Sequence, residues 1–278
     1  ELLPSGAAAL SAEPTGWDLH SDLDLAIRAA RAAGREVMRH FRGGGEVRYK
    51  EPGQPVTEAD LAADRVLREM LLRERPGYGW LSEETADSPE RLERTRVWVV
   101  DPIDGTHSFV DGKPEFAVSV GLAVDGLPLL GVVFNPARDE LYHAHRGGGA
   151  FLNGEPVRVG GVREGVRPVA VASGFEFEHG AFAPFRDEWE IRLLGSTTLK
   201  MVAVADGTAD VYLSPGTKKE WDVCAADLIV REAGGQVTDL AGAEIRYNRP
   251  EPYVAGALVT GGLPHDATLA RVPAGCRE

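Results

Sequence analysis

The stretch Val99-Val100-Asp101-Pro102-Ile103-Asp104-Gly105-Thr106 joins an apolar run to two closely spaced carboxylates. An acidic side chain directly after a buried strand is costly unless it is paired or binds a cation. Pro102 cannot donate to the hydrogen-bond ladder of a sheet, so we expect the strand to end there. Because Asp104 lies three residues after Asp101, a tight turn could direct both carboxylates to one point. The stretch therefore predicts a buried strand that ends in an acidic turn.

The last two residues of this stretch could bind an anion beside the acidic turn. Gly105 permits a close approach of the backbone, and Thr106 can begin a helix whose free N–H groups face an anion. Converging carboxylates next to such a helix start fit Mg²⁺ and phosphate, because hard oxygen ligands favour Mg²⁺ over zinc. The chain also lacks Cys and His at zinc-ligand spacing. A capped turn with solvated acids is the alternative, and spacing alone leaves both interpretations open.

Two helices are predicted before this stretch. Apolar residues recur at helical spacing from Leu23 to Phe41, and the glycines at 43–45 end that pattern. A second helix is expected to start at Thr57, because Thr57-x-x-Asp60 resembles a capping box.

Strands are predicted after it. Residues 116–124 alternate between apolar and other side chains, Asp125-Gly126 is a preferred hairpin turn, and residues 127–134 return. A further strand is expected at 140–145. The first half thus predicts two helices beside an antiparallel sheet.

The pattern changes after about residue 161. Short strands near 168–172, 210–213 and 257–260 alternate with helices near 197–205 and 222–233. Alternating elements favour an α/β arrangement. We therefore expect three parts. They are a loosely ordered extension at 1–16, an N-terminal α+β subdomain with the acidic motifs at 17–160, and a C-terminal α/β subdomain with substrate-binding elements at 161–278.

Composition excludes some classes of partner. The 278-residue chain has a formal net charge of −13 and no basic block. Binding to a nucleic-acid polymer or to an anionic membrane surface depends on clustered Lys and Arg, so neither is expected. No stretch approaches the roughly 20 apolar residues that span a bilayer. A phosphorylated small molecule remains possible if bound cations supply the positive field.

The cysteines and the N-terminal segment bear on the compartment. Cys224 and Cys276 give no disulfide framework, so a reducing cytoplasm is expected. Cys224 lies in an apolar helical pattern and is expected in the core. Residues 1–16 lack a basic n-region and make a poor secretory signal.

Three segments in order resemble the signatures of the inositol monophosphatase superfamily, which are Mg²⁺-dependent, Li⁺-sensitive phosphatases. They are Leu81-Ser82-Glu83-Glu84-Thr85, the Asp-Pro-Ile-Asp-Gly-Thr stretch at 101–106, and Glu220-Trp221-Asp222-Val223-Cys224-Ala225-Ala226. The resemblance runs from about Leu23 to Thr260. It implies a layered αβαβα sandwich of two subdomains, the sugar-phosphatase fold.

The resemblance also implies roles for individual residues, with two or three Mg²⁺ ions per site. Glu83, Asp101 and the backbone carbonyl of Ile103 match the ligands of a first ion. Asp101, Asp104 and Asp222 match those of a second.

Further residues match groups that act on the substrate. Thr106, with Asp60 as its acidic partner, matches the hydroxyl that orients the attacking water, and Glu83 is counted as catalytic as well. Gly105 and Thr106 match the phosphate-binding amides. His107 could touch the substrate, although a solvated helix residue is the alternative.

The second half carries the substrate signals. Gly195-Ser196-Thr197-Thr198-Leu199-Lys200, Lys218-Lys219-Glu220-Trp221-Asp222 and Arg246-Tyr247-Asn248 resemble segments of bacterial 3'(2'),5'-bisphosphate nucleotidases. The expected substrate contacts are Gly195, Ser196, Lys200, Lys219 and Glu220. The expected reaction converts adenosine 3',5'-bisphosphate to AMP and phosphate.

One departure keeps an alternative open. His107-Ser108-Phe109 is nearer the inositol-phosphatase pattern, so an inositol-1-monophosphatase or a broad sugar phosphatase is the second reading. A catalytically silent ligand sensor should have lost a metal carboxylate or Thr106, and the chain retains all of them. A homodimer is possible.

Overall fold

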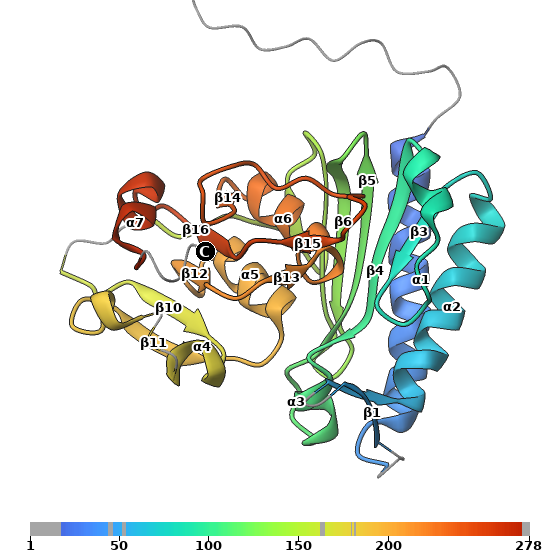
Figure 1. Cartoon of the computed structure of the whole chain (residues 1–278), viewed down its shortest axis with the longest axis horizontal. Coiled ribbons are helices and arrows are strands. Elements are labelled where there is room, and N and C mark those ends of the chain that lie inside the picture. The colour runs from blue at the N-terminus through green and yellow to red at the C-terminus, as the bar shows by residue number, and fades with distance from the viewer. Residues whose placement is uncertain are drawn as a thin grey trace, which may run out of the picture.

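The computed structural model of the chain describes residues 18–43, 47–51, 54–161, 165–178, 180 and 182–273. The predicted extension at 1–16 lies outside these residues. Helices and sheets alternate in five layers, which Figure 1 shows from the α1 and α2 pair on the right to α7 on the left. This arrangement confirms the predicted layered sandwich.

The first layer consists of two helices that pack on each other and cover one face of the first sheet. They are α1 (Leu19–His40) and α2 (Glu58–Glu74). Thr57 is the N-cap of α2 and forms the predicted capping box with Asp60. Among the described residues, no helix is both long and apolar enough to cross a bilayer.

The second layer is a seven-stranded sheet whose strands follow chain order. They are β3 (Gly79–Ser82), β4 (Arg96–Asp104), β5 (Ala117–Val124), β6 (Leu127–Asn135), β7 (Glu140–His145), β8 (Ala150–Leu152) and β9 (Glu155–Val157). Only the β3–β4 pair is parallel in this sheet. The predicted Asp125-Gly126 hairpin turn is confirmed, and both of its residues have positive φ.

The prediction that the strand ends at Pro102 is wrong, because β4 continues to Asp104. Asp101 pairs with Ser119 and Asp104 with Ala117, so three steps along β4 match two steps along β5. This extra residue is a β-bulge, which bends a strand and redirects its side chains. The bulge accommodates Pro102 within β4. The predicted acidic turn is therefore part of the sheet.

The fourth layer is a five-stranded sheet of order β11-β10-β12-β16-β14. Its strands are β10 (Val169–Ala172), β11 (Glu190–Leu193), β12 (Val211–Ser214), β14 (Gln236–Thr238) and β16 (Ala257–Thr260). β10 is parallel to both neighbours, and the other pairs are antiparallel. Helix α7 (His265–Arg271) belongs to the last layer.

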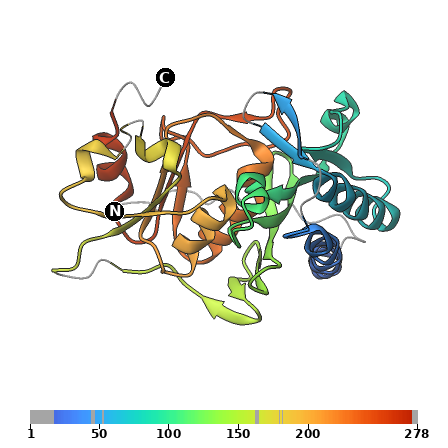
Figure 2. The same ribbon diagram turned by 90° about the horizontal axis from the view of Figure 1, so that it is seen from below.

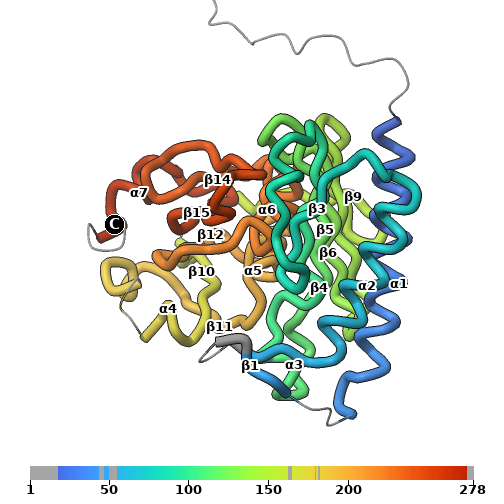
Figure 3. The backbone as a smooth tube through the Cα atoms, turned by 45° about the vertical axis from the view of Figure 1, so that its right-hand side comes forward, coloured from blue at the N-terminus to red at the C-terminus, as the bar shows by residue number. Residues whose placement is uncertain are grey.

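Short elements surround these layers. They are the ribbon of β1 (Val47–Glu51) and β2 (Gln54–Thr57), the ribbon of β13 (Lys218–Lys219) and β15 (Tyr253–Val254), the helices α3 (Thr106–Val110) and α4 (Gly174–Glu178), and the 3₁₀ turns η1 (Pro89–Glu93) and η2 (Ala183–Phe185). Figure 3 shows β1 and α3 together at the lower end of the molecule.

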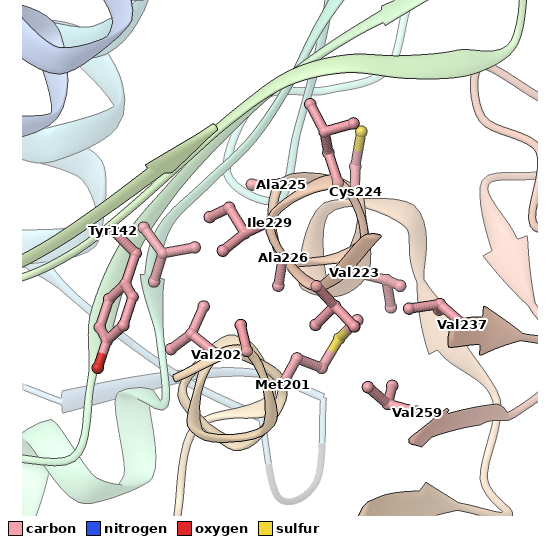
Figure 4. Close-up of a cluster of buried hydrophobic side chains, with 14 of the residues drawn as sticks. Tyr142, Met201, Val202, Val223, Cys224, Ala225, Ala226, Ile229, Val237 and Val259 are labelled. Atoms are coloured by element: carbon pink, nitrogen blue, oxygen red, sulfur yellow. The ribbon is translucent and has the colours of Figure 1, made fainter. Parts of the chain in front are cut away.

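The third layer consists of α5 (Thr197–Ala205) and α6 (Glu220–Glu232), which lie between the two sheets. Figure 4 shows their apolar side chains, including Val202 and Ile229, facing one another and Tyr142 of the first sheet. Cys224 is fully buried there, as predicted. Since α6 packs on β5 and β6, the division into subdomains near residue 160 stays a proposal, although the sheets do change between β9 and β10.

Two glycines let α6 approach the first sheet closely. A Cβ at Gly131 would lie 2.1 Å from the carbonyl oxygen of Ala225, and one at Gly121 would lie 2.8 Å from Cys224 Sγ. Backbone atoms cannot move aside without moving the helix. Because Asp222 is in the first turn of α6, this packing also sets the position of a predicted metal ligand.

We expect Gly131→Ala to lower the free energy of unfolding by about 1–3 kcal/mol, because overpacking a dense core forces backbone shifts. The measurement is urea denaturation followed by circular dichroism. Gly77→Ala is the matched control, since a Cβ at Gly77 would meet nothing within 4 Å. Equal midpoints for the two variants would contradict this account of α6 packing.

Candidate active site

The structure brings the predicted carboxylates together from four segments. Asp60 lies in the first turn of α2, Glu83 follows β3, Asp101 and Asp104 end β4, and Asp222 lies in the first turn of α6. The negative charges of the other four raise the pKa of Asp101, in addition to the effect of its burial. Such mutual repulsion requires that the groups share one region of low dielectric.

Asp101, like Asp60, is almost completely enclosed by the protein. Its side chain is 2% exposed, and its Oδ1 accepts a hydrogen bond from the Ile103 N–H at 3.0 Å. Burial is the larger cause of its raised pKa, and the charge of Glu83 comes next. Burial, with the charges of Asp104 and Glu83, also raises the pKa of Asp222 to about 7. A bound cation would relieve both repulsions.

Asp60 connects the start of α2 to the acidic turn. Its Oδ2 accepts hydrogen bonds from the N–H and the hydroxyl of Thr57, at 2.7 and 2.6 Å. The Thr106 hydroxyl lies 3.2 Å from Asp60 Oδ1 and 3.0 Å from the carbonyl oxygen of Ile103. The structure therefore joins Asp60, Thr106 and Ile103, which the sequence placed in one site.

Asp104 points in a direction that the sequence did not predict. Its Oδ2 accepts hydrogen bonds from the Ser196 hydroxyl and from the N–H and hydroxyl of Thr198, both of the latter at 2.6 Å. Its Oδ1 accepts from the Thr197 N–H at 3.2 Å. The carboxylate thus caps the N-terminus of α5, where negative charge is favourable. Seen from below (Figure 2), α3, just after Asp104, lies beside α5.

A second buried acid on α2 orients the loop that carries Glu83. Asp64 accepts hydrogen bonds from the hydroxyls of Ser82 and Thr85, the latter at 2.7 Å. Asp64 was not among the residues predicted from the sequence. The signal was present, because Asp64 lies one helical turn after Asp60 beside the apolar stripe.

The donor set fits a hard divalent cation. All donors are oxygens, from carboxylates and the Ile103 carbonyl, as Mg²⁺ prefers. Within the described residues, however, the structure has no group of three or more His, Cys, Asp or Glu side chains already arranged to hold a metal ion. The oxygens of Asp104 accept hydrogen bonds from the start of α5. Glu83, Asp101 and Asp222 are the side chains most suited to hold the ion.

Several predicted substrate contacts have structural partners instead. Ser196 is fully buried and caps α5. The Gly195 N–H donates to Glu115 Oε2, and a Cβ at Gly195 would lie 2.1 Å from Ser108 Oγ. His107 is exposed on α3. The contact of Ser196 with substrate stays a prediction, and in this structure its hydroxyl donates to Asp104.

Glu220 also has partners within the protein. Its fully buried carboxylate accepts hydrogen bonds from the N–H groups of Asn248 and Arg249, at 2.6 and 2.9 Å. The buried Arg91 binds the Asn248 side chain, the Arg249 carbonyl and Asp87. This network ties the segment after Glu83 to the start of α6. The expectation that Glu220 contacts substrate stays a prediction.

The predicted lysines differ in their surroundings. Lys200 is 1% exposed, and its ammonium donates to Glu176 Oε2 at 3.0 Å. Its contact with substrate stays a prediction. The Lys219 ammonium lies over the ring of Tyr253, 3.9 Å from its centroid. Lys218 lies 3.5 Å from Glu176 Oε1. Glu176 was missed, because α4 is too short to give a helical pattern.

Comparison with known proteins agrees with this fold. The family model described as inositol monophosphatase family matches residues 18–272. The inositol-1-monophosphatase of Rhizobium meliloti (strain 1021) is 37% identical over 253 residues, which cover 86% of this chain and 91% of the relative.

Solved structures share the architecture. The extragenic suppressor protein suhB from Bartonella henselae has a TM-score of 0.80 at 30% identity, covering 92% of this chain and 99% of that one. Inositol monophosphatase-II from Staphylococcus aureus has been solved with inositol monophosphate bound and with 2'AMP bound. Both of these structures have a TM-score of 0.74, at 25% and 26% identity, and cover 89% and 87% of this chain and 91% and 89% of theirs.

We expect Asp101→Asn to lower kcat by at least about two orders of magnitude, as for the loss of one preorganised electrostatic group. Without metal, the same variant should unfold at a temperature equal to or above that of the wild type, because a buried repulsive charge is gone. Steady-state kinetics and thermal denaturation measure the two effects. Asp125→Asn, the same change in an exposed turn, is the control. A variant that keeps half of the activity would exclude Asp101 from the reaction.

Proposed function

The chain belongs to the inositol monophosphatase family and is a phosphomonoester hydrolase of that family, and we propose that its substrate is inositol 1-phosphate. Two curated relatives, from Rhizobium meliloti and Mesorhizobium japonicum, are named inositol-1-monophosphatase, at 37% and 38% identity. The family is metal-dependent, generally with Mg²⁺. The all-oxygen donor set at the end of β4 supports metal-dependent hydrolysis, and the names of the two relatives support the substrate.

The bisphosphate nucleotidase reading has less support than this alternative. Three of the residues that suggested it, Ser196, Lys200 and Glu220, bind other parts of the protein. The Tyr247 hydroxyl likewise donates to Asp227, at 2.8 Å. These residues of the nucleotidase-like segments make contacts within the protein. Their resemblance to nucleotidases therefore gives no information about the substrate. His107-Ser108-Phe109, the inositol-phosphatase feature, is on α3 beside the acidic turn.

The proposed roles of the chain's own residues follow from the site. Glu83, Asp101, Asp222 and the Ile103 carbonyl hold the metal, and Asp104 joins them if it gives up hydrogen bonds to α5. Mg²⁺, when bound, is a Lewis acid that polarises a phosphoryl oxygen and makes water a stronger nucleophile. The number of ions, two or three, stays a prediction.

Thr106 is proposed to orient the attacking water. Its hydroxyl lies between Asp60 Oδ1 and the Ile103 carbonyl oxygen. Asp60 is buried and bound by Thr57, so its position is fixed before substrate arrives. The N–H groups of Gly105 and Thr106 in the same turn are proposed to bind the phosphate. The homodimer expected from the sequence also stays a prediction.

A side-by-side substrate panel tests this proposal. We expect the purified protein to release phosphate from inositol 1-phosphate with Mg²⁺, to lose that activity in excess chelator, and to regain it when Mg²⁺ is restored. Li⁺ should inhibit. Phosphate release is measured colorimetrically, with Asp101→Asn as the blank for contaminating phosphatases.

Two results would contradict the proposal. Full activity in excess chelator would exclude a metal-dependent reaction at the carboxylates. If the protein hydrolyses adenosine 3',5'-bisphosphate but not inositol 1-phosphate, the proposed active site would stand and the proposed substrate would be wrong.

A further inference from the structure

Three histidines lie together where the start of α1 meets β7. His143 and His145 are two residues apart on β7, and alternate side chains of a strand point to the same face of its sheet. Leu141, in the same series, belongs to the hydrophobic cluster that α1 forms with the first sheet, so this face is the one that α1 covers. His20, in the first turn of α1, contacts His145 with ring centroids 4.9 Å apart.

The spacing of His20 and His145 suits a shared metal ion. Histidine nitrogens bind Zn²⁺ at about 2.0–2.1 Å, in a tetrahedral arrangement. That distance and angle place the centroids of two imidazoles on one ion about 5 Å apart, and the observed separation is 4.9 Å. An edge-to-face contact between rings has the same spacing. The ring nitrogens therefore have to decide between the two.

The nitrogens of the two β7 histidines favour a ligand. His145 Nδ1 lies 3.2 Å from the carbonyl oxygen of Arg146. Because a carbonyl only accepts, Nδ1 carries the proton of the neutral ring and Nε2 keeps its lone pair. Metal-binding histidines are commonly oriented by such a bond. His143 Nδ1 is buried and has no hydrogen-bond partner within the described part of the chain. A buried polar atom rarely lacks a partner, and a bound ion is one group that can supply it.

The surroundings of His143 keep its imidazole neutral, as metal binding requires. Burial is the largest cause that lowers the pKa of His143, and His145 lowers it further. Asp24 acts on the same pKa in the opposite sense. It follows His20 by four residues on α1, so the two side chains share one face of the helix. The exposed carboxylate of Asp24 is the candidate for a fourth ligand.

We propose that His20, His143 and His145 form a Zn²⁺ site that is separate from the carboxylate site and fastens the start of α1 to β7. Imidazole is a ligand for Zn²⁺, whereas Mg²⁺ prefers oxygen, so the two sites select different ions. Sequence spacing did not indicate zinc, because His20 precedes His143 by more than 120 residues and only the fold brings α1 to β7.

Ion binding has to rotate at least one of the three rings. Within the described residues, no three metal-binding side chains are already arranged around one point. His20 is exposed, so its ring is the one with room to turn. A ring that turns at the surface gives up little packing.

The proposed site lies apart from the acidic cluster. His143 pairs with Val132 of β6, which pairs with Val120 of β5, which pairs with Val100 of β4. Three strand spacings therefore separate this point of β7 from β4, a distance of about 14 Å. We accordingly expect the ion to stabilise the fold and to leave phosphate release unchanged.

Thermal unfolding with added Zn²⁺, at a constant excess of Mg²⁺, tests the proposal. The wild type should unfold at a higher temperature as Zn²⁺ is added, because an ion that binds only the folded state stabilises it. His20→Asn and His145→Asn should lose most of this shift. His40→Asn, which changes a histidine at the other end of α1, is the matched control and should keep it. Asp101→Asn should keep it too, since a shift caused by Zn²⁺ at the carboxylates would be lost there.

Co²⁺ in place of Zn²⁺ reports the geometry of the ligands. Tetrahedral Co²⁺ absorbs visible light strongly, whereas octahedral Co²⁺ absorbs it weakly. We expect one tetrahedral Co²⁺ per wild-type chain and an affinity at least about 10-fold lower in each single histidine variant. Gly148→Ala should lower the affinity as well, because a Cβ there would lie 2.3 Å from His145 Nε2. If His143→Gln does not fold, the exposed His20→Asn decides the point.

The outcomes separate this inference from the proposed function. An equal Zn²⁺ shift in the wild type and in both His20→Asn and His145→Asn would overturn the histidine site. A shift that only Asp101→Asn removes, no shift in the wild type, or a purely octahedral Co²⁺ spectrum would overturn it as well. Phosphate release from inositol 1-phosphate with Mg²⁺ is measured independently, so a failure there would reject the proposed function and leave the histidine site in place.

Discussion

The structure of this molecule depends on one constraint: several carboxylates of like charge lie close together and largely out of contact with water. Asp101 and Asp222 have raised pKa values because burial and neighbouring carboxylates oppose their ionisation. A fold can keep such groups only if other interactions hold them in place. Asp104 does so across the two halves of the chain, since it caps an α5 helix that begins more than 90 residues later. If Asp104 is a metal ligand, as the sequence predicts, it has to give up some of these bonds.

The parts of the fold that depend on neighbouring residues could be predicted from the sequence. The capping box of Thr57 with Asp60 and the turn at Asp125-Gly126 are both local patterns, and both are present. The bulge that carries β4 past Pro102 was not predictable, because it depends on the register with β5. The acidic cluster was predicted as a set, yet the direction of Asp104 was not. Capping of α5 is a tertiary contact that spacing does not encode.

The substrate signals show why a motif can mislead. Glu220 and Asn248 lie 28 residues apart and bind each other, so two segments that looked like independent evidence for a nucleotidase are one structural contact. Lys200 and Glu176 form a similar pair. A charged residue in a recognisable motif therefore speaks for a substrate only when its partner is known.

The carboxylates of Glu83, Asp101 and Asp222 are proposed to form the cation site. Anomalous scattering from crystals soaked in Mn²⁺, in place of Mg²⁺, tests it most directly. The account predicts a strong peak about 2 Å from a carboxylate oxygen of Asp101, the distance expected for a small divalent cation with oxygen ligands. Saturating Mn²⁺ that gives no peak at Asp101, or peaks only at surface carboxylates, would contradict the account.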